Sequence, residues 1–296
     1  MIVVGPVVED RQRLADGSTL RFPGGNATVF AATIAGLGVP ARVLAEIGSD
    51  AAGDSIVTLL ERHGVDTSWI ARTSEPTKRA SLDVAGDGSW IATHGASSSR
   101  AYLPSSLPTG VHAFFSSHSS SGRDSRRLHV AGLNSLLRSD VDRLMALLDS
   151  CDRSFAPVSF GLNRFDAGQE RVVRDLATRA DVIFCNAEEL SFFLGLDVVD
   201  RAGVVAALRD AKPGDLGRGH WVVTCGADGA VAQRDGRCVE RPAVPVADVR
   251  STVGAGDRLS AAYLAAMIDG RGPEECLGAG SQAAAETLGS LRWDRA

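Results

Sequence analysis

Apolar residues in the first part of the chain alternate between short β-branched runs and helical spacings. The run from Ile2 to Gly5 predicts a buried strand, and residues 26–37 place apolar side chains at helical intervals. A second buried run at 41–47 and a second helical pattern at 53–63 follow. Strand and helix in this order predict parallel strands that are joined by right-handed crossovers.

The same rhythm returns in the second half of the chain. Continuous apolar runs, typical of strands that helices cover on both faces, lie at 128–133, 154–160, 182–185 and 221–225. Asn186 and Gly226 follow the last two runs, at the sheet edge where open α/β proteins bind ligands. The pattern predicts one α/β domain over residues 1–296, with a mostly parallel central sheet sandwiched by helices in a Rossmann-type three-layer arrangement.

Two segments depart from this rhythm. Between Thr77 and Thr93 the apolar period changes around a turn at 85–89, which predicts an antiparallel hairpin. That hairpin is either a plain edge element or part of a lid over a substrate site. Residues 95–127 are rich in serine and predict a loop, although clustered hydroxyls and arginines also suit contact with phosphate.

Composition narrows the class of protein. The chain has 296 residues, of which 44% are hydrophobic and 23% charged, as in globular proteins. It has no apolar run long enough for a bilayer and no signal-peptide pattern at its start, so we expect a cytoplasmic protein without a membrane partner. A net charge of −5 argues against a nucleic-acid partner. Five widely spaced cysteines indicate neither a metal knuckle nor a disulfide framework.

The segment Arg250–Asp257 carries the most specific chemistry. Gly254 and Gly256 leave no Cβ in the way of a ligand, and the backbone N–H groups of a starting helix favour an anion. Asp257 follows at once, and an acid beside a phosphate suits the removal of a hydroxyl proton during phosphoryl transfer. The alternative is that Asp257 only caps the helix, because Asp is among the preferred N-cap residues.

Three other segments of the chain carry motifs that accompany the one at 251–257. Four segments resemble, in the same order, the motifs of the ribokinase-like (PfkB-type) sugar and nucleoside kinases. They are the Gly-Gly region at 22–38, Asn-x-x-Glu at 186–189, Thr-x-Gly-x-x-Gly at 224–229 and the Asp-Thr-x-Gly-Ala-Gly-Asp signature at 251–257. The resemblance covers nearly the whole chain and implies a ribokinase-like fold. It also implies a small β lid contributed by residues 9–22 and 76–101.

The resemblance implies an ATP-dependent kinase that moves the γ-phosphate of ATP to an alcohol group of a sugar or nucleoside-like small molecule. ATP and Mg²⁺ are the implied cofactors, and a homodimer through the lid is the implied assembly. The implied catalytic residues are the general base Asp257 and the anion hole Gly254, Ala255 and Gly256. The implied nucleotide-binding residues are Asn186, Thr224, Gly226, Gly229, Thr252 and Ser281, with Glu189 holding Mg²⁺ through water. The implied substrate-binding residues are Asp10, Gly24, Gly25, Asn26 and Asn163.

Each of these positions also has a plainer interpretation. Asn186 suits a turn or helix cap, and Glu189 suits the first turn of a helix. The Gly226–Gly229 segment suits a hairpin turn between two strands. Asp10 lies in the charged run at 9–13 and suits a solvated loop.

The chain departs from the family at several polar positions. Val8, Val29 and Gly161 stand where the family often has Asn, Asn and Asp, so we expect a substrate with fewer hydroxyl groups. Ser251 replaces an Asp that helps to hold a monovalent cation in some members, so the resemblance does not extend to potassium activation. Arg258 opposes the helix dipole. It either assists phosphate binding or, in the preferred interpretation, projects to solvent.

Two other functions compete with a kinase. A sugar or nucleotide sensor with the same fold and impaired catalysis would explain the missing polar residues, but the intact Asp257 favours a kinase. A nicotinamide-dependent oxidoreductase is disfavoured, because the segment after Gly5 lacks the GxGxxG pattern. No GxxxxGK[ST] segment occurs, which excludes a P-loop.

Overall fold

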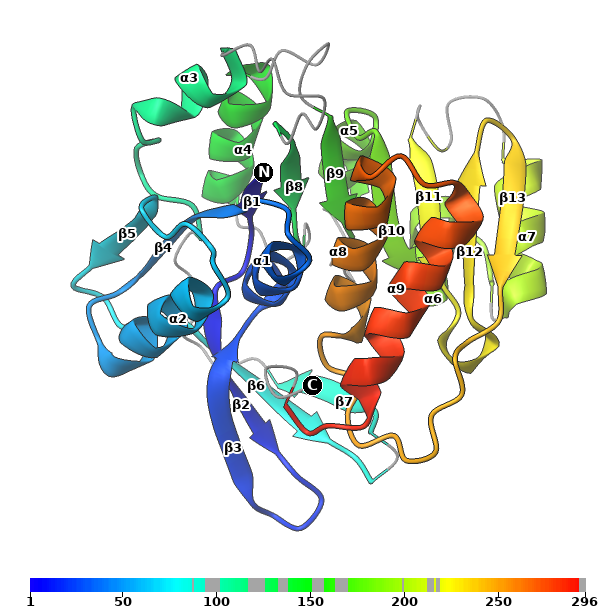
Figure 1. Cartoon of the computed structure of the whole chain (residues 1–296), viewed down its shortest axis with the longest axis horizontal. Helices are drawn as coiled ribbons and strands as arrows, with labels where there is room; N and C mark the ends of the chain where they lie inside the picture. Colours follow the sequence, from blue (N-terminus) through cyan, green and yellow to red (C-terminus); the bar gives the residue numbers. More distant parts are fainter. Residues whose placement is uncertain are drawn as a thin grey trace.

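In the computed structural model, the protein has a large sheet with helices on both faces and a smaller sheet at one end (Figure 1). The structure describes residues 1–86, 88–93, 102–116, 126–132, 138–150, 157–162, 170–198, 200–211, 216 and 219–292. The strands are β1 (Ile2–Val4), β2 (Val8–Arg13), β3 (Thr19–Gly24), β4 (Arg42–Gly48), β5 (Ile70–Thr73), β6 (Arg79–Val84), β7 (Trp90–Thr93), β8 (Leu128–Val130), β9 (Val158–Gly161), β10 (Val182–Asn186), β11 (His220–Thr224), β12 (Ala230–Arg234) and β13 (Arg237–Arg241). The helices are α1 (Asn26–Gly36), α2 (Ala51–Arg62), α3 (Gly110–Ser116), α4 (Arg138–Ser150), α5 (Glu170–Ala177), α6 (Ala187–Leu194), α7 (Arg201–Asp210), α8 (Ala255–Ile268) and α9 (Pro273–Leu288), with a 3₁₀ turn, η2, at Gly226–Asp228.

The large sheet is mostly parallel, as predicted. Its strand order is β13-β12-β11-β10-β9-β8-β1-β4-β5. Every neighbouring pair from β11 to β5 is parallel, whereas β12 and β13 add an antiparallel edge. The parallel strands therefore bring the ends of β10 and β11 to one edge, where Asn186 pairs with Thr224.

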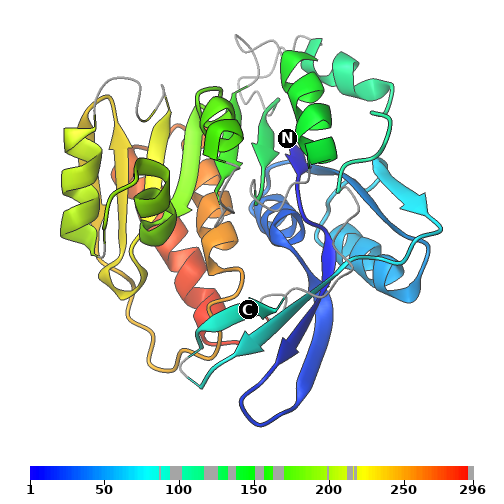
Figure 2. The same cartoon turned by 180° about the vertical axis from the view of Figure 1, so that it is seen from behind.

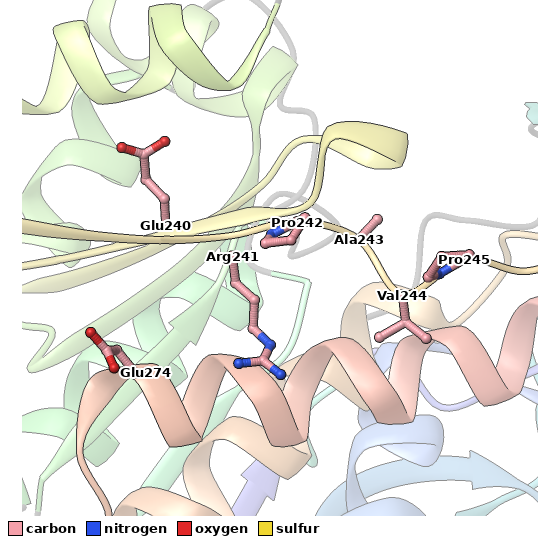
Figure 3. A pocket seen from close by; sticks show the side chains of 7 residues that line it. All are labelled: Glu240, Arg241, Pro242, Ala243, Val244, Pro245 and Glu274. Carbon is pink, nitrogen blue, oxygen red and sulfur yellow. The ribbon is translucent and has the colours of Figure 1, made fainter.

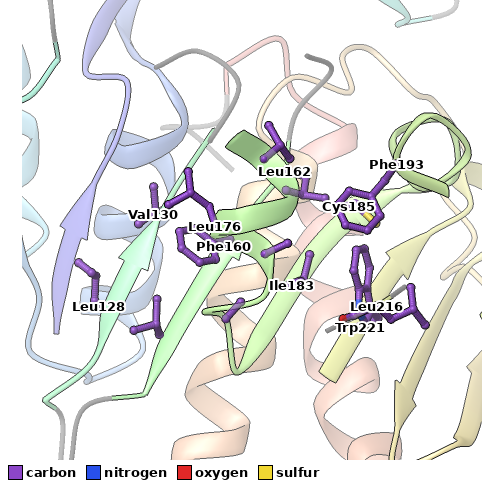
Figure 4. Packing of buried hydrophobic residues seen from close by; sticks show 14 of the residues in the cluster. Leu128, Val130, Phe160, Leu162, Leu176, Ile183, Cys185, Phe193, Leu216 and Trp221 are labelled. Atoms are coloured by element: carbon purple, nitrogen blue, oxygen red, sulfur yellow. The ribbon is translucent and has the colours of Figure 1, made fainter. Parts of the chain in front are cut away.

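Strand β1 shows how the sheet separates two apolar layers. Ile2 and Val4 belong to one core cluster, and Val3 between them belongs to the other. Helices α1, α8 and α9 cover the face seen in Figure 1, and α6 and α7 cover the opposite face seen in Figure 2. Figure 4 shows part of the second layer, where Phe160, Ile183 and Trp221 pack side by side on neighbouring strands. The predicted three-layer arrangement is confirmed.

The small sheet has the order β3-β2-β6-β7 and contains the predicted hairpin as β6 and β7. Strands β2 and β3 also belong to it, although the charged run at 9–13 suggested a solvated loop. Burial alternates along β2: Val8, Asp10 and Gln12 are buried, whereas the side chains between them are more exposed. Inward-facing residues therefore recur at every second position, as expected for a strand. Because two of them, Asp10 and Gln12, are polar, a search for alternating apolar residues does not find this strand.

The serine-rich segment is not wholly a loop, which corrects part of that prediction. Helix α3 spans Gly110–Ser116, and its Val111 and Phe115 are buried in the core. Tertiary burial of these apolar side chains outweighs the loop-forming composition around them. Residues 95–101 and 117–125 of this segment, and the predicted substrate residue Asn163, lie outside the described residues. None of the helices in the described ranges is long and apolar enough to span a membrane.

Candidate functional site

Asp257 sits in the first turn of α8 and does not cap it. The N-cap is Gly254, in the left-handed conformation with φ of 81°, and Asp257 is the third helical residue. Its two carboxylate oxygens accept hydrogen bonds from the side-chain amide of Asn26, at 3.0 and 3.1 Å. The interpretation of Asp257 as a simple cap is therefore wrong.

Asn26 reaches Asp257 because two helices start at the same place. Asn26 is the first residue of α1, directly after Gly24 and Gly25 at the end of β3, and α1 packs against α8. Gly25 has φ of 87°, and a Cβ there would lie 2.4 Å from the Pro6 carbonyl oxygen. The Gly-Gly pair thus allows the chain to turn from the small sheet into α1 beside the predicted base.

The predicted anion hole has an open centre. Gly256 is exposed, and a Cβ at this position would have no neighbour within 4 Å. The N–H group of Ala255 donates to the Thr252 carbonyl at 3.3 Å, so this predicted donor is engaged within the loop. The buried Ser251 hydroxyl accepts from the Val253 N–H at 3.2 Å, which holds the loop that leads to Gly254.

Asp10 is the second acid of the site and is only 4% exposed. It lies directly against Gly24, where an added Cβ would fall 2.0 Å from a carboxylate oxygen of Asp10. Gly24 is therefore required by the close approach of that side chain. The interpretation of Asp10 as a solvated loop acid is wrong, because β2 turns it inward.

Burial raises the pKa values of the three acids of the site, and the charge of Asp257 adds to the shift in the other two. Desolvation raises the pKa of Asp257 to about 7, and the Asn26 hydrogen bond opposes this shift. Desolvation, with the charge of Asp257, raises the pKa of Asp10 to about 7, against a hydrogen bond from the Gly25 backbone. Desolvation also raises the pKa of Glu189 to about 8, and the charge of Asp257 again contributes. Asp257 thus lies within electrostatic reach of both other acids.

Asn186 and Glu189 form a reciprocal cap at the start of α6. The Asn186 side chain accepts from the Glu189 N–H at 2.8 Å, and the Glu189 carboxylate accepts from the Asn186 N–H at 2.9 Å. Their interpretation as helix-capping residues is confirmed. A role in holding Mg²⁺ stays a prediction. Within the described ranges, no three or more His, Cys, Asp or Glu side chains are grouped to hold a metal ion.

The segment Thr224–Gly229 joins two antiparallel strands, β11 and β12, as the plainer interpretation predicted. Cys225 and Gly229 close the turn through a backbone hydrogen bond of 2.7 Å. A Cβ at Gly229 would lie 2.0 Å from the Arg241 carbonyl oxygen, so the turn presses against the chain that leaves β13. The turn and a ligand-binding role are compatible.

A cavity of about 580 Å³ adjoins this turn, between the exit of β13 and α9 (Figure 3). Its lining residues are Glu240, Arg241, Pro242, Ala243, Val244, Pro245 and Glu274. Figure 3 shows the Arg241 side chain extending toward α9, where its guanidinium carbon lies 3.2 Å from the position of a Cβ on Gly278. Nothing in the sequence motifs predicts this cavity. The only signal was the proline-flanked segment at 242–245, which indicates an irregular connection.

Thr252 and Ser281, which the resemblance assigned to nucleotide binding, both face other parts of the protein. Both the N–H and the hydroxyl of Thr252 donate to the Gly88 carbonyl, and Ser281 is a buried residue of α9.

Arg258 does not project to solvent, which corrects the preferred interpretation. Its side chain is 14% exposed and lies 3.9 Å from Glu286 of α9. Desolvation lowers the pKa of Arg258, and the charge of Glu286 opposes that shift.

Two of the apolar replacements pack into the protein. Val8 is buried in β2, and Val29 is buried in a small cluster with Phe22, Ala32 and Leu59. Val29 of α1 thus packs in a cluster that joins β3, which carries Phe22, to α2, which carries Leu59. In this chain, packing of the small sheet accounts for an apolar side chain at that position.

Comparisons with known proteins identify the family and support the fold. A family model described as pfkB family carbohydrate kinase matches residues 2–292. The chain is 27% identical over 267 residues to a ribokinase from Arabidopsis thaliana. This match covers 88% of the chain and 65% of that relative, so the chain spans somewhat less than two thirds of the relative's length.

Solved structures share the fold at low identity. The structure of Arabidopsis thaliana ribokinase complexed with ribose and ATP has a TM-score of 0.78 and 22% identity, covering 99% of this chain and 94% of that one. Aminoimidazole riboside kinase from Salmonella enterica, complexed with aminoimidazole riboside and an ATP analogue, has a TM-score of 0.76 and 19% identity, covering 98% and 94%. These likenesses support the ribokinase-like fold.

Proposed function

The chain belongs to the pfkB family of carbohydrate kinases, and from this premise we propose that it transfers the γ-phosphoryl group of ATP to an alcohol group of a sugar or nucleoside. The observation that supports the proposal most is the placement of Asp257. It stands in the first turn of α8, next to an open glycine, and within electrostatic reach of the buried Asp10. These positions support a site in which Asp257 is the base, the backbone around Gly256 binds the transferred phosphoryl group and Asp10 binds a substrate hydroxyl.

In the proposed reaction, the substrate hydroxyl oxygen attacks the γ-phosphorus of ATP in line, and the bond between that phosphorus and the β-γ bridging oxygen breaks to leave ADP. The hydroxyl proton passes to the carboxylate of Asp257, whose pKa of about 7 suits a base near neutral pH. Backbone N–H groups of Gly254 and Gly256 stabilise the charge on the transferred group. Asp10 accepts a hydrogen bond from a second substrate hydroxyl.

The nucleotide is proposed to lie along the ends of β10 and β11, beside Asn186, Thr224 and the turn at Gly226–Gly229. The cavity at Arg241 adjoins that turn and offers room for the part of the nucleotide that extends away from the phosphates. Glu189 and Asn186 present the oxygen ligands that Mg²⁺ prefers, directly or through water. When bound with ATP, Mg²⁺ would neutralise charge on the phosphates.

A pooled library of sugars and nucleosides, incubated with the protein and Mg-ATP, tests the proposal through ADP release. We expect ADP to appear above the no-acceptor rate with at least one pool. Asp257→Asn should lower kcat by about 10²–10⁴-fold and leave the affinity for ATP nearly unchanged, because only the proton acceptor is lost. Asp269→Asn, at the far end of the same helix, is the matched control.

Two outcomes would contradict the assignment. If Asp257→Asn were as active as the natural protein, Asp257 would not be the general base. Binding of a sugar by calorimetry, without ADP release in any pool, would support the competing function of a sensor.

A further inference from the structure

The Asn26 side chain makes direct hydrogen bonds to the carboxylate of the predicted base, Asp257. Its amide nitrogen lies 3.0 Å from one carboxylate oxygen and 3.1 Å from the other, although 231 residues separate the two positions. A donor placed symmetrically between both oxygens defines the rotation of the carboxylate as well as its position. Each carboxylate oxygen keeps a lone pair for a substrate hydroxyl.

We propose that Asn26 is a positioning residue for Asp257, holding its carboxylate in a fixed orientation and stabilising its charged form. This proposal rests on the function proposed above for Asp257. It changes the expected role of Asn26, which the family resemblance assigned to substrate binding. Asn26 is well placed for this role because it begins α1, and α1 packs against α8.

The charges around Asp257 show why such a donor is needed. Asp10 of β2 and Glu189 of α6 both interact electrostatically with Asp257 and oppose its ionisation when they are charged. Arg258 is next in the chain and lies near Glu286 of α9. The Asn26 amide is the hydrogen-bond donor that lowers the pKa of Asp257 against desolvation. Without it, the base would hold its proton to a higher pH.

The first test is a pH profile of kcat/KM for Asn26→Ala with an acceptor that the natural protein phosphorylates. The limb on which activity rises with pH should move upward by about one pH unit, a roughly tenfold loss of charged base below the natural midpoint. The KM for ATP should not change. Gln282→Ala, which removes an exposed amide that donates to Glu286, is the matched control and should leave the limb in place.

The second test does not depend on activity. Titration of the Asp257 carboxyl carbon by ¹³C NMR, assigned by its absence in Asp257→Asn, should show a higher pKa in Asn26→Ala than in the natural chain. Asn26→Asp keeps the side-chain shape, removes the donor and adds a like charge, so it should raise the pKa of Asp257 further. If Asn26→Ala does not fold, the titration of Asn26→Asp provides the test instead.

The outcomes separate the two proposals. If no acceptor is phosphorylated but the NMR shift appears, the proposed function fails and the positioning contact stands. If the acceptor KM rises while both the limb and the NMR titration stay in place, Asn26 binds substrate only and the positioning role is overturned.

Discussion

The carbonyl oxygen of Gly88 accepts two hydrogen bonds from Thr252, one from its N–H group at 3.0 Å and one from its hydroxyl at 3.2 Å. Gly88 lies in the turn between β6 and β7, and Thr252 lies in the loop before α8. The β6–β7 turn of the small sheet is therefore hydrogen-bonded to the loop that leads to Gly254 and α8. This contact links the small sheet to the start of α8.

Gly88→Ala should loosen this contact. Gly88 has φ of 80°, and a Cβ there would lie 3.0 Å from a methyl group of Val249 and 3.1 Å from its carbonyl oxygen. We expect a loss of about 1–2 kcal/mol in the free energy of unfolding, since a left-handed conformation disfavours alanine. Urea unfolding measures it. Gly86→Ala in the same turn meets no atom within 4 Å and serves as the control; equal effects of the two would contradict the prediction.

The stability of the protein should fall as pH rises from mildly acidic to mildly basic. The folded-state pKa values of Asp10 and Asp257 are about 7 and that of Glu189 about 8, above the ordinary 3.8 and 4.5. These three acids therefore bind more protons in the folded protein than in the unfolded chain up to about pH 7 to 8, and the free energy of unfolding decreases as pH rises. Desolvation lowers the pKa values of the buried His129 and His220 to about 3 and about 4, so these two groups oppose the decline below about pH 6.5. The decline is therefore expected to be clearest between about pH 6.5 and pH 8.

Unfolding in urea between about pH 6.5 and pH 8 tests this sign, because in that range the two histidines are largely neutral in both the folded and the unfolded state. Asp257→Asn and Asp10→Asn should each show a shallower decline, because each removes one raised pKa. The same decline in both variants as in the natural chain would show that these acids are not the cause.

Val29→Asn should destabilise the protein. Val29 is 2% exposed and packs with Phe22 and Leu59, so an amide there is buried without water. We expect a loss of about 1–3 kcal/mol in the free energy of unfolding. Leu37→Asn, at the exposed end of the same helix, should change it by less than about 0.5 kcal/mol. An unchanged stability of Val29→Asn would indicate that the position faces a hydrated site.

Gly229→Ala should weaken ATP binding. The new Cβ would fall 2.0 Å from the Arg241 carbonyl oxygen and 2.7 Å from the Ala243 nitrogen, so the backbone at the cavity has to move. We expect the KM for ATP to rise about tenfold, roughly the effect of losing 1.4 kcal/mol of binding. Gly226→Ala meets no atom within 4 Å and should raise the KM less. A KM for ATP that Gly229→Ala leaves unchanged would place the nucleotide elsewhere.

Hydrophobic periodicity alone predicted most of the parallel strands, the helices α1 and α2 and the hairpin at Thr77–Thr93, because those elements bury apolar side chains at regular intervals. It did not predict β2, whose buried positions include Asp10 and Gln12. It also did not predict α3, whose apolar side chains are few and lie in a serine-rich segment. In both cases burial by the surrounding elements, and not local composition, decided the structure.

The site divides in the same way. The sequence by itself identified the candidate glycines and acids, because the motifs are local features that a single chain displays. Only the tertiary structure decided that Asn26 bonds Asp257, that Arg258 turns inward to Glu286, and that Gly88 meets Thr252. These contacts join segments far apart in the chain, and their geometry depends on how helices and sheets pack, which no local pattern encodes.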